Sequence, residues 1–128
     1  MKTILVDAVD TFVIENHGID QDMHKLLETF SNKKIILTNA NDEEAIRFGL
    51  VNLPYELFSL KHQPNKTDPK YYKIMFERLG LKKEDVIYFE HNPEAVKSAK
   101  TVGMNTYYFD PEKRDLVGLK NYLTGNLK

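Results

Sequence analysis

The feature that most constrains this chain is a regular alternation, from end to end, of short β-branched apolar runs with segments of helical periodicity. Buried strands are predicted over 3–6, 34–37, 55–60, 86–89 and 106–109. A helix is predicted after each of the first, second, third and fourth runs, and a terminal helix over 116–123. Such alternation builds βαβ units, so we expect an α/β fold with a mainly parallel sheet of about five strands, covered by helices on both faces.

Residues suited to cap helices mark where four of these helices begin. Asp20 precedes the first helix, and Asn41 with Glu44 three residues later has the spacing of a capping box. Asp68–Pro69 and Asn92–Pro93 each follow a polar cap with proline at the first helical position.

Length and composition narrow the classes of protein that the chain can belong to. The 128 residues fit one domain, over 1–128, and the formal net charge of -1 is unlike that of a general nucleic-acid binder. The chain has no cysteine, which excludes disulfides and thiolate chemistry. No apolar run reaches the roughly 20 residues of a membrane helix, and Asp7 interrupts the N-terminal run. We therefore expect a cytoplasmic protein without membrane or nucleic-acid partners.

Polar residues follow the predicted strands at the places where ligands bind in parallel α/β sheets. The first strand ends at Asp7, the second at Thr38–Asn39 and the fourth at Glu90–His91, while Lys66 lies before a helix start. A carboxylate can attack phosphorus, a hydroxyl and backbone N–H groups can hold phosphate oxygens, and a lysine can offset negative charge. Each residue alone has an ordinary structural role, but their joint placement indicates a phosphoryl-transfer site.

Four segments, Ile4–Phe12, Ile36–Ala40, Lys66–Tyr72 and Val86–Val96, resemble the four motifs of the haloacid-dehalogenase (HAD) superfamily. The first motif, an apolar strand followed by Asp-x-Asp-Gly-Thr, is similar to Ile4–Phe12, and the second is similar to Ile36–Ala40. The Lys-Pro-Asp-Pro stretch of the third resembles Lys66–Tyr72. The fourth resembles Val86–Val96, with a typical continuation over Ala99–Met104. The resemblance covers nearly the whole chain and implies a Rossmann-like three-layer α/β/α sandwich without a cap domain, with a short flap after the first strand.

The resemblance also implies roles for individual residues and a cofactor, Mg²⁺. It makes Asp7 the nucleophile, which forms an aspartyl phosphate, and Lys66 the residue that steadies the charge. It places substrate phosphate against Thr38, Asn39 and Ala40. Metal contacts are implied for Asp7, the backbone carbonyl of Val9 and Glu90.

The first motif departs from the family pattern at the acid–base position. Phosphatases of the family carry a second aspartate two residues after the nucleophile, where this chain has Val9. General acid–base catalysis contributes typically 10²–10⁴-fold, so ester hydrolysis is expected to be slow. Asp10 comes one position later, and in an extended segment its side chain points to the opposite face. A substrate whose leaving group needs no proton, such as an acyl phosphate, would suit this site.

The fourth motif departs as well. Glu90 is longer than the usual aspartate, and His91 replaces a second acid. Imidazole is a poor ligand for Mg²⁺ and suits transition metals better. Glu94, one helical turn on, is either a further carboxylate for the metal or a first-turn acid favoured by the helix dipole. Mg²⁺ binding is therefore expected to be weakened but not abolished.

Three functions remain open on the sequence alone. The first is a slow or specialised HAD-like phosphohydrolase, and the second is an inactive HAD-like binding or regulatory module. The third is 2-haloacid dehalogenase chemistry, which needs neither an acid at Val9 nor a metal but is disfavoured because the chain has no cap. The open site is expected to take a phosphate-bearing small molecule or macromolecule, covered by a second copy in a homodimer or by a partner protein. His17, His24 and His62 lack ligand spacing and are predicted to be surface residues.

Overall fold

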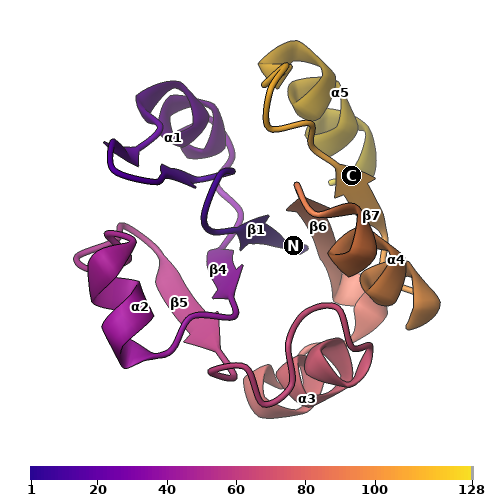
Figure 1. Cartoon of the computed structure of the whole chain (residues 1–128). Coiled ribbons are helices and arrows are strands. Elements are labelled where there is room, and N and C mark those ends of the chain that lie inside the picture. Colours follow the sequence, from indigo (N-terminus) through magenta and orange to yellow (C-terminus); the bar gives the residue numbers. More distant parts are fainter. Residues whose placement is uncertain (128) are drawn as a thin grey trace.

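The computed structural model describes residues 1–127, which alternate between strands and helices as the sequence predicts (Figure 1). The strands are β1 (Thr3–Asp7), β2 (Val13–Ile14), β3 (Gly18–Ile19), β4 (Lys34–Thr38), β5 (Glu56–Ser59), β6 (Val86–Glu90) and β7 (Thr106–Tyr108). The helices are α1 (Gln21–Glu28), α2 (Asp42–Arg47), α3 (Lys70–Leu79), α4 (Pro93–Thr101) and α5 (Leu116–Asn126), with a 3₁₀ turn over Lys83–Asp85.

A five-stranded sheet in the order β5-β4-β1-β6-β7 forms the centre of the protein, and every neighbouring pair in it is parallel. β1 lies in the middle, because Leu5 pairs with Ile35 of β4 on one side and with Tyr88 of β6 on the other. All five residues of β1 are buried. The parallel α/β sheet predicted from the alternating pattern is confirmed, and its strands end at one common edge.

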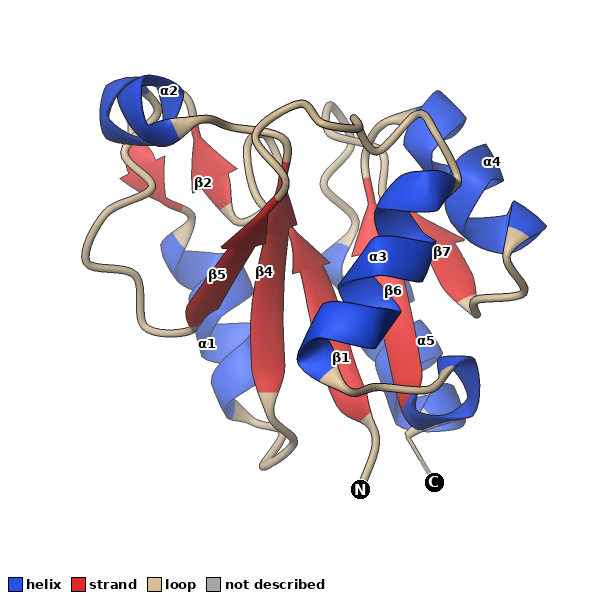
Figure 2. Cartoon of the chain, turned by 90° about the horizontal axis from the view of Figure 1, so that it is seen from below, coloured by secondary structure: helices blue, strands red, loops and turns tan. Residues whose placement is uncertain are grey.

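Helices cover both faces of the sheet and make three layers. Alternate residues of β1 point to opposite faces, so Ile4 packs in a core with α1 and α5, while Leu5 packs with α3 and α4. Figure 2 shows α3 on the near side of the sheet and α1 and α5 on the far side. The second core contains two buried tyrosines of α3, Tyr71 and Tyr72.

Three of the four predicted caps are confirmed. The Asp20 carboxylate accepts from the backbone N–H groups of α1, Asn41 and Glu44 form a reciprocal capping box on α2, and Asn92 caps α4 ahead of its proline. The prediction for Asp68 was wrong by one residue, because Pro69 is itself the N-cap of α3 and makes no side-chain cap. The Asp68 carboxylate still accepts from the N–H of Lys70, at 2.9 Å.

The flap after β1 is a small hairpin of β2 and β3, in which Val13 pairs with Ile19. Arg114, in the loop before α5, binds the flap at 2.7 Å through the backbone carbonyls of Asp10 and Thr11. Its guanidinium also contacts the Asp20 carboxylate at 2.7 Å. One side chain from the end of the chain thus joins the flap to the start of α1.

Between residues 1 and 127, none of the helices is both long enough and apolar enough to cross a bilayer.

Candidate active site

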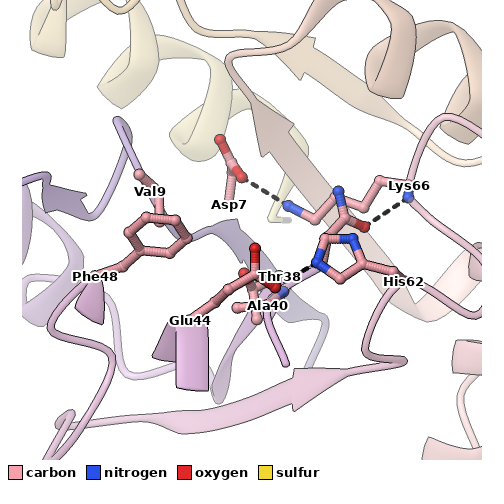
Figure 3. Close-up of a pocket in the computed structure, with 9 residues that line it drawn as sticks. Asp7, Val9, Thr38, Ala40, Glu44, Phe48, His62 and Lys66 are labelled. Carbon is pink, nitrogen blue, oxygen red and sulfur yellow. Dashed lines mark hydrogen bonds and ion pairs between the residues drawn. The ribbon is translucent and has the colours of Figure 1, made fainter. Parts of the chain in front are cut away.

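The carboxyl ends of three adjacent strands bring the predicted polar residues together. Asp7, Thr38 and Glu90 are the last residues of β1, β4 and β6, and Lys66 arrives from the loop between β5 and α3. All four are buried, with between 1% and 5% of each residue exposed. Beside them lies a pocket of about 230 Å³ (Figure 3). It is lined by Asp7, Val9, Thr38, Asn39, Ala40, Glu44, Phe48, His62 and Lys66.

Lys66 joins the two buried carboxylates. Its ammonium nitrogen lies 2.7 Å from Asp7 Oδ1 and 3.0 Å from Glu90 Oε1. The backbone N–H of Lys66 donates to the Asn39 side-chain oxygen at 2.7 Å, which ties the lysine loop to the end of β4. Asn39 therefore lines the pocket and also positions the lysine. Tyr88, buried below, donates its hydroxyl to the same Glu90 oxygen as Lys66 does.

His91 contacts the same two carboxylates through their other oxygens. Its Nδ1 is hydrogen-bonded to Asp7 Oδ2 and lies 3.3 Å from Glu90 Oε2. Asp7 Oδ2 also accepts from the backbone N–H of His91 at 3.2 Å and from the Thr11 hydroxyl at 2.7 Å. The two carboxylates therefore lie between an ammonium group and an imidazole, and each offers one oxygen to either side.

These contacts set the protonation of the groups. Burial alone would raise the pKa of Asp7, but the charge of Lys66 and the contacts with His91 hold this pKa well below its usual range. Burial alone would lower the pKa of Lys66, but Asp7 and Glu90 raise it well above its usual value. Burial alone would also lower the pKa of His91, but its contacts with Asp7 and Glu90 raise this pKa to about 10. Asp7 is therefore an anion at neutral pH.

The end of β4 presents the groups expected to hold a phosphate. The Thr38 hydroxyl oxygen accepts from the Ala40 N–H at 3.2 Å, which leaves the hydroxyl hydrogen free to point elsewhere. The Thr38 carbonyl is fixed by the Tyr71 hydroxyl at 2.8 Å, and the Ala40 carbonyl accepts from Ser59 at 2.6 Å. Thr38, Asn39 and Ala40 all line the pocket, and these hydrogen bonds hold their loop in place beside it.

Val9 also lines the pocket, two residues after Asp7, as its place in the sequence suggests. Asp10 does not line it: it has a left-handed backbone conformation with φ of 68°, and its carbonyl accepts from Arg114. Glu94 is exposed in the first turn of α4 and does not belong to the group of Asp7, Glu90 and His91. Of its two alternatives, the placement favours the first-turn acid.

Three pocket residues were not foreseen as such from the sequence: Glu44, Phe48 and His62. His62 lies at the surface as predicted, with 41% of its side chain exposed, and it also lines the pocket. His62 is hydrogen-bonded to Glu44 through one nitrogen and lies 2.7 Å from Asn65 through the other. These hydrogen bonds raise the pKa of His62 above its usual value. Its left-handed backbone, with φ of 67°, turns the ring toward α2, and no sequence spacing marks this.

Asp7, Glu90 and His91 are the residues that could hold a metal ion. Each offers one ligand atom, and these atoms lie within 4.8 Å of one another. The two carboxylates fit Mg²⁺, which prefers oxygen, whereas the imidazole does not. The Mg²⁺ expected from the family resemblance therefore meets two suitable ligands and one unsuitable one.

Comparisons with known proteins show similarity of structure at low sequence identity. No family model and no curated protein matches the chain. The crystal structure of a "putative beta-phosphoglucomutase" from Thermotoga maritima aligns with a TM-score of 0.60 and 14% identity, over 84% of this chain and 85% of that one.

Two uncharacterised proteins are similar as well. The one from Listeria monocytogenes serotype 4b has a TM-score of 0.65 and 15% identity, over 88% of this chain and 80% of its own. The one from Corynebacterium glutamicum has a TM-score of 0.56 and 17% identity, over 93% and 92%. The chain shares their fold. This agrees with the Rossmann-like α/β architecture predicted from the sequence, and the chemistry has to be argued from the site itself.

Proposed function

We propose that the chain is a HAD-like phosphohydrolase that works through an aspartyl phosphate at Asp7. The observation that carries this proposal is the buried contact of 2.7 Å between Lys66 Nζ and Asp7 Oδ1, at a pocket that also contains the Thr38 hydroxyl. The lysine keeps Asp7 ionised and supplies positive charge where phosphate oxygens would lie. The four motif-like segments and the shared fold support the same family.

The reaction would run in two steps. In the first, Asp7 Oδ1 attacks phosphorus, the bond from phosphorus to the leaving-group oxygen breaks, and its electron pair departs with that oxygen. Thr38 and the adjacent backbone would hold the phosphoryl oxygens while Lys66 offsets their charge. In the second step, water attacks phosphorus, the bond to Oδ1 breaks, and the proton of the water ends on the released phosphate. Asp7 returns as a carboxylate.

The pocket favours a substrate whose leaving group is already a stable anion. Val9 lines the pocket where an acid would protonate an alkoxide, and valine has no proton to give. A carboxylate leaves an acyl phosphate without protonation, so this step loses nothing by the substitution. We therefore infer an acyl phosphate or a comparable anhydride as the preferred substrate class, ahead of alkyl phosphate esters.

Mg²⁺ remains the cofactor that the resemblance implies. Asp7, Glu90 and the backbone carbonyl of Val9 would hold it, and it would supply positive charge beside the phosphoryl group. The imidazole of His91 occupies the side of both carboxylates on which such an ion would sit.

The test is phosphate release from acetyl phosphate and from a panel of phosphate monoesters, with and without Mg²⁺. We expect acetyl phosphate to be the best substrate and Asp7→Asn to abolish its hydrolysis. Asp22→Asn makes the same change on an exposed turn of α1 and should leave the rate unaltered. Release that persists in Asp7→Asn would refute the aspartyl-phosphate mechanism.

A second candidate is a binding or regulatory module that has kept the fold without turnover. Two observations favour it: Val9 at the acid–base position, and the imidazole of His91 held against Asp7 Oδ2. In that case inorganic phosphate should bind, by calorimetry, with no hydrolysis of any compound in the panel. Failure of both binding and turnover would rule out this candidate and the hydrolase together.

A further inference from the structure

The two buried carboxylates divide their oxygens between two partners. Lys66 takes Asp7 Oδ1 and Glu90 Oε1, at 2.7 and 3.0 Å. Asp7 Oδ2 and Glu90 Oε2 face the other way and meet His91 Nδ1, the second of them at 3.3 Å. Two oxygens and one nitrogen therefore converge on a single point on the side remote from the lysine.

The spacing of these three atoms is that of ligands around one metal ion. Bonds of about 2.0–2.2 Å to first-row metals place neighbouring ligand atoms roughly 3 Å apart. The three atoms lie within 4.8 Å of one another, so small side-chain shifts suffice to bring them to that spacing. Both carboxylates come from adjacent strands of a parallel sheet and His91 directly follows one of them, so their backbones are fixed.

The type of the third ligand sets the type of metal. Two carboxylate oxygens alone suit Mg²⁺, Ca²⁺ or Mn²⁺, whereas imidazole nitrogen suits ions such as Co²⁺, Ni²⁺ and Zn²⁺. Mg²⁺ demands near-ideal octahedral geometry with oxygen ligands, and here the imidazole lies where a third oxygen would be.

A cation at this point must take the place of the proton on the His91 ring, because the ion and the proton compete for Nδ1. A divalent ion would replace the one proton held between His91 and Asp7 Oδ2, so that proton is released to solvent as the ion binds. Because the ion takes over the contact made by the ring, Asp7 Oδ2 gains no additional partner.

We propose that Asp7 Oδ2, Glu90 Oε2 and His91 Nδ1 form a site that binds a first-row transition-metal ion of the Co²⁺ to Zn²⁺ class in preference to Mg²⁺. The proposal concerns the same site as the proposed hydrolase and, as regards the use of the ion in catalysis, rests on that function. Binding of the ion itself can be measured without turnover.

The experiment is a titration of the purified full chain with Co²⁺ at a fixed pH of about 7.5, followed by proton NMR. The chain has four histidines, and a ring that coordinates paramagnetic Co²⁺ gives resonances shifted far outside the normal range. We expect one such ring, with Zn²⁺ displacing Co²⁺ at equal concentration and a hundredfold excess of Mg²⁺ failing to do so.

Two substitutions at His91 and one matched control locate the ion. His91→Asn should remove the shifted ring signals and lower Co²⁺ affinity at least tenfold. His91→Asp should restore an all-oxygen set and allow Mg²⁺ to compete, which guards against one variant failing to fold. His17→Asn makes the same change as the first variant at an exposed position in the flap and should leave Co²⁺ binding intact.

Three results would each overturn the proposal. They are no Co²⁺ binding to the wild-type chain, shifted signals that survive in His91→Asn, and displacement of Co²⁺ by a hundredfold excess of Mg²⁺. The test of the metal site and the test of the proposed hydrolase can fail independently of each other. Co²⁺ bound through His91 without any Asp7-dependent turnover would refute the hydrolase and leave the metal site standing. Asp7-dependent turnover combined with displacement by Mg²⁺ would refute the metal preference alone.

Discussion

Replacing Lys66 with methionine should show how strongly the folded state depends on the buried ion-pair group. Lys66 is 4% exposed and contacts two carboxylates at 2.7 and 3.0 Å. At an effective dielectric constant of about 20, each contact has a Coulomb energy of roughly 6 kcal/mol, much of which offsets the cost of desolvating the charges. Removing one partner of a buried pair costs about 3–5 kcal/mol, so we expect Lys66→Met to lower the free energy of unfolding by that amount at pH 7.

Urea denaturation measures this directly. With a slope of about 2 kcal/mol per molar urea, the midpoint should fall by roughly 2 M, while Lys73→Met, on an exposed turn of α3, should leave it almost unchanged. The difference in the free energy of unfolding between wild type and Lys66→Met should become smaller as the pH is lowered. In the wild type, the depressed pKa of Asp7 contributes stability that is present above its unfolded pKa of 3.8 and lost as the pH falls through the folded value.

Lys66→Met removes the positive charge that lowers the pKa of Asp7 most. The folded variant therefore gains less stability from the ionised Asp7 carboxylate, and it has less to lose when that group is protonated. The difference in stability between wild type and Lys66→Met should therefore shrink as the pH falls below 3.8. Equal effects of Lys66→Met and Lys73→Met, or a difference between wild type and Lys66→Met that stays constant with pH, would refute the reasoning.

Three further changes test other parts of the site. Val9→Asp should restore a proton donor and raise the hydrolysis of phosphate monoesters by about 10²–10⁴-fold; no gain in a folded variant would mean that this position does not reach the leaving group. Arg114→Met removes hydrogen bonds from a charged group to the flap and should cost about 1–3 kcal/mol, with faster amide exchange in the flap as the specific readout. His62 should titrate above 6.5 by NMR and return toward that value in Glu44→Gln, because its raised pKa reflects their hydrogen bond. That pair contributes stability below pH 6.5, which is lost as the pH rises through the folded pKa, and an unchanged titration in Glu44→Gln would contradict this origin.

The sequence predicted those parts of the site that depend on strand order. In a parallel sheet the last residues of neighbouring strands must meet, so Asp7, Thr38 and Glu90 could be brought together from their positions alone. Lys66 could be included because it precedes a recognisable helix start. At these positions each observed strand extends one residue beyond the predicted strand, and the added residues are Asp7, Thr38 and Glu90.

The remaining features depend on loop conformations that no periodicity encodes. His62 reaches the pocket through a left-handed backbone and meets Glu44, which lies 18 residues earlier in the chain. The direction of the His91 ring, toward both carboxylates, follows from the turn between β6 and α4. Asp10 does not line the pocket, and it lies in a left-handed turn held by Arg114 and not in the extended segment that was expected.

The contact between Arg114 and the flap spans 104 residues of sequence and has a consequence for synthesis. Asp10 and Thr11 leave the ribosome 104 and 103 residues before Arg114, so until Arg114 emerges the flap lacks the guanidinium that holds its two carbonyls. The middle strand β1 also lacks its pairing partner on one side, β6, until residue 90 has been made. We therefore expect a nascent chain to complete the flap contacts and the sheet on both sides of β1 only after Arg114 has been made.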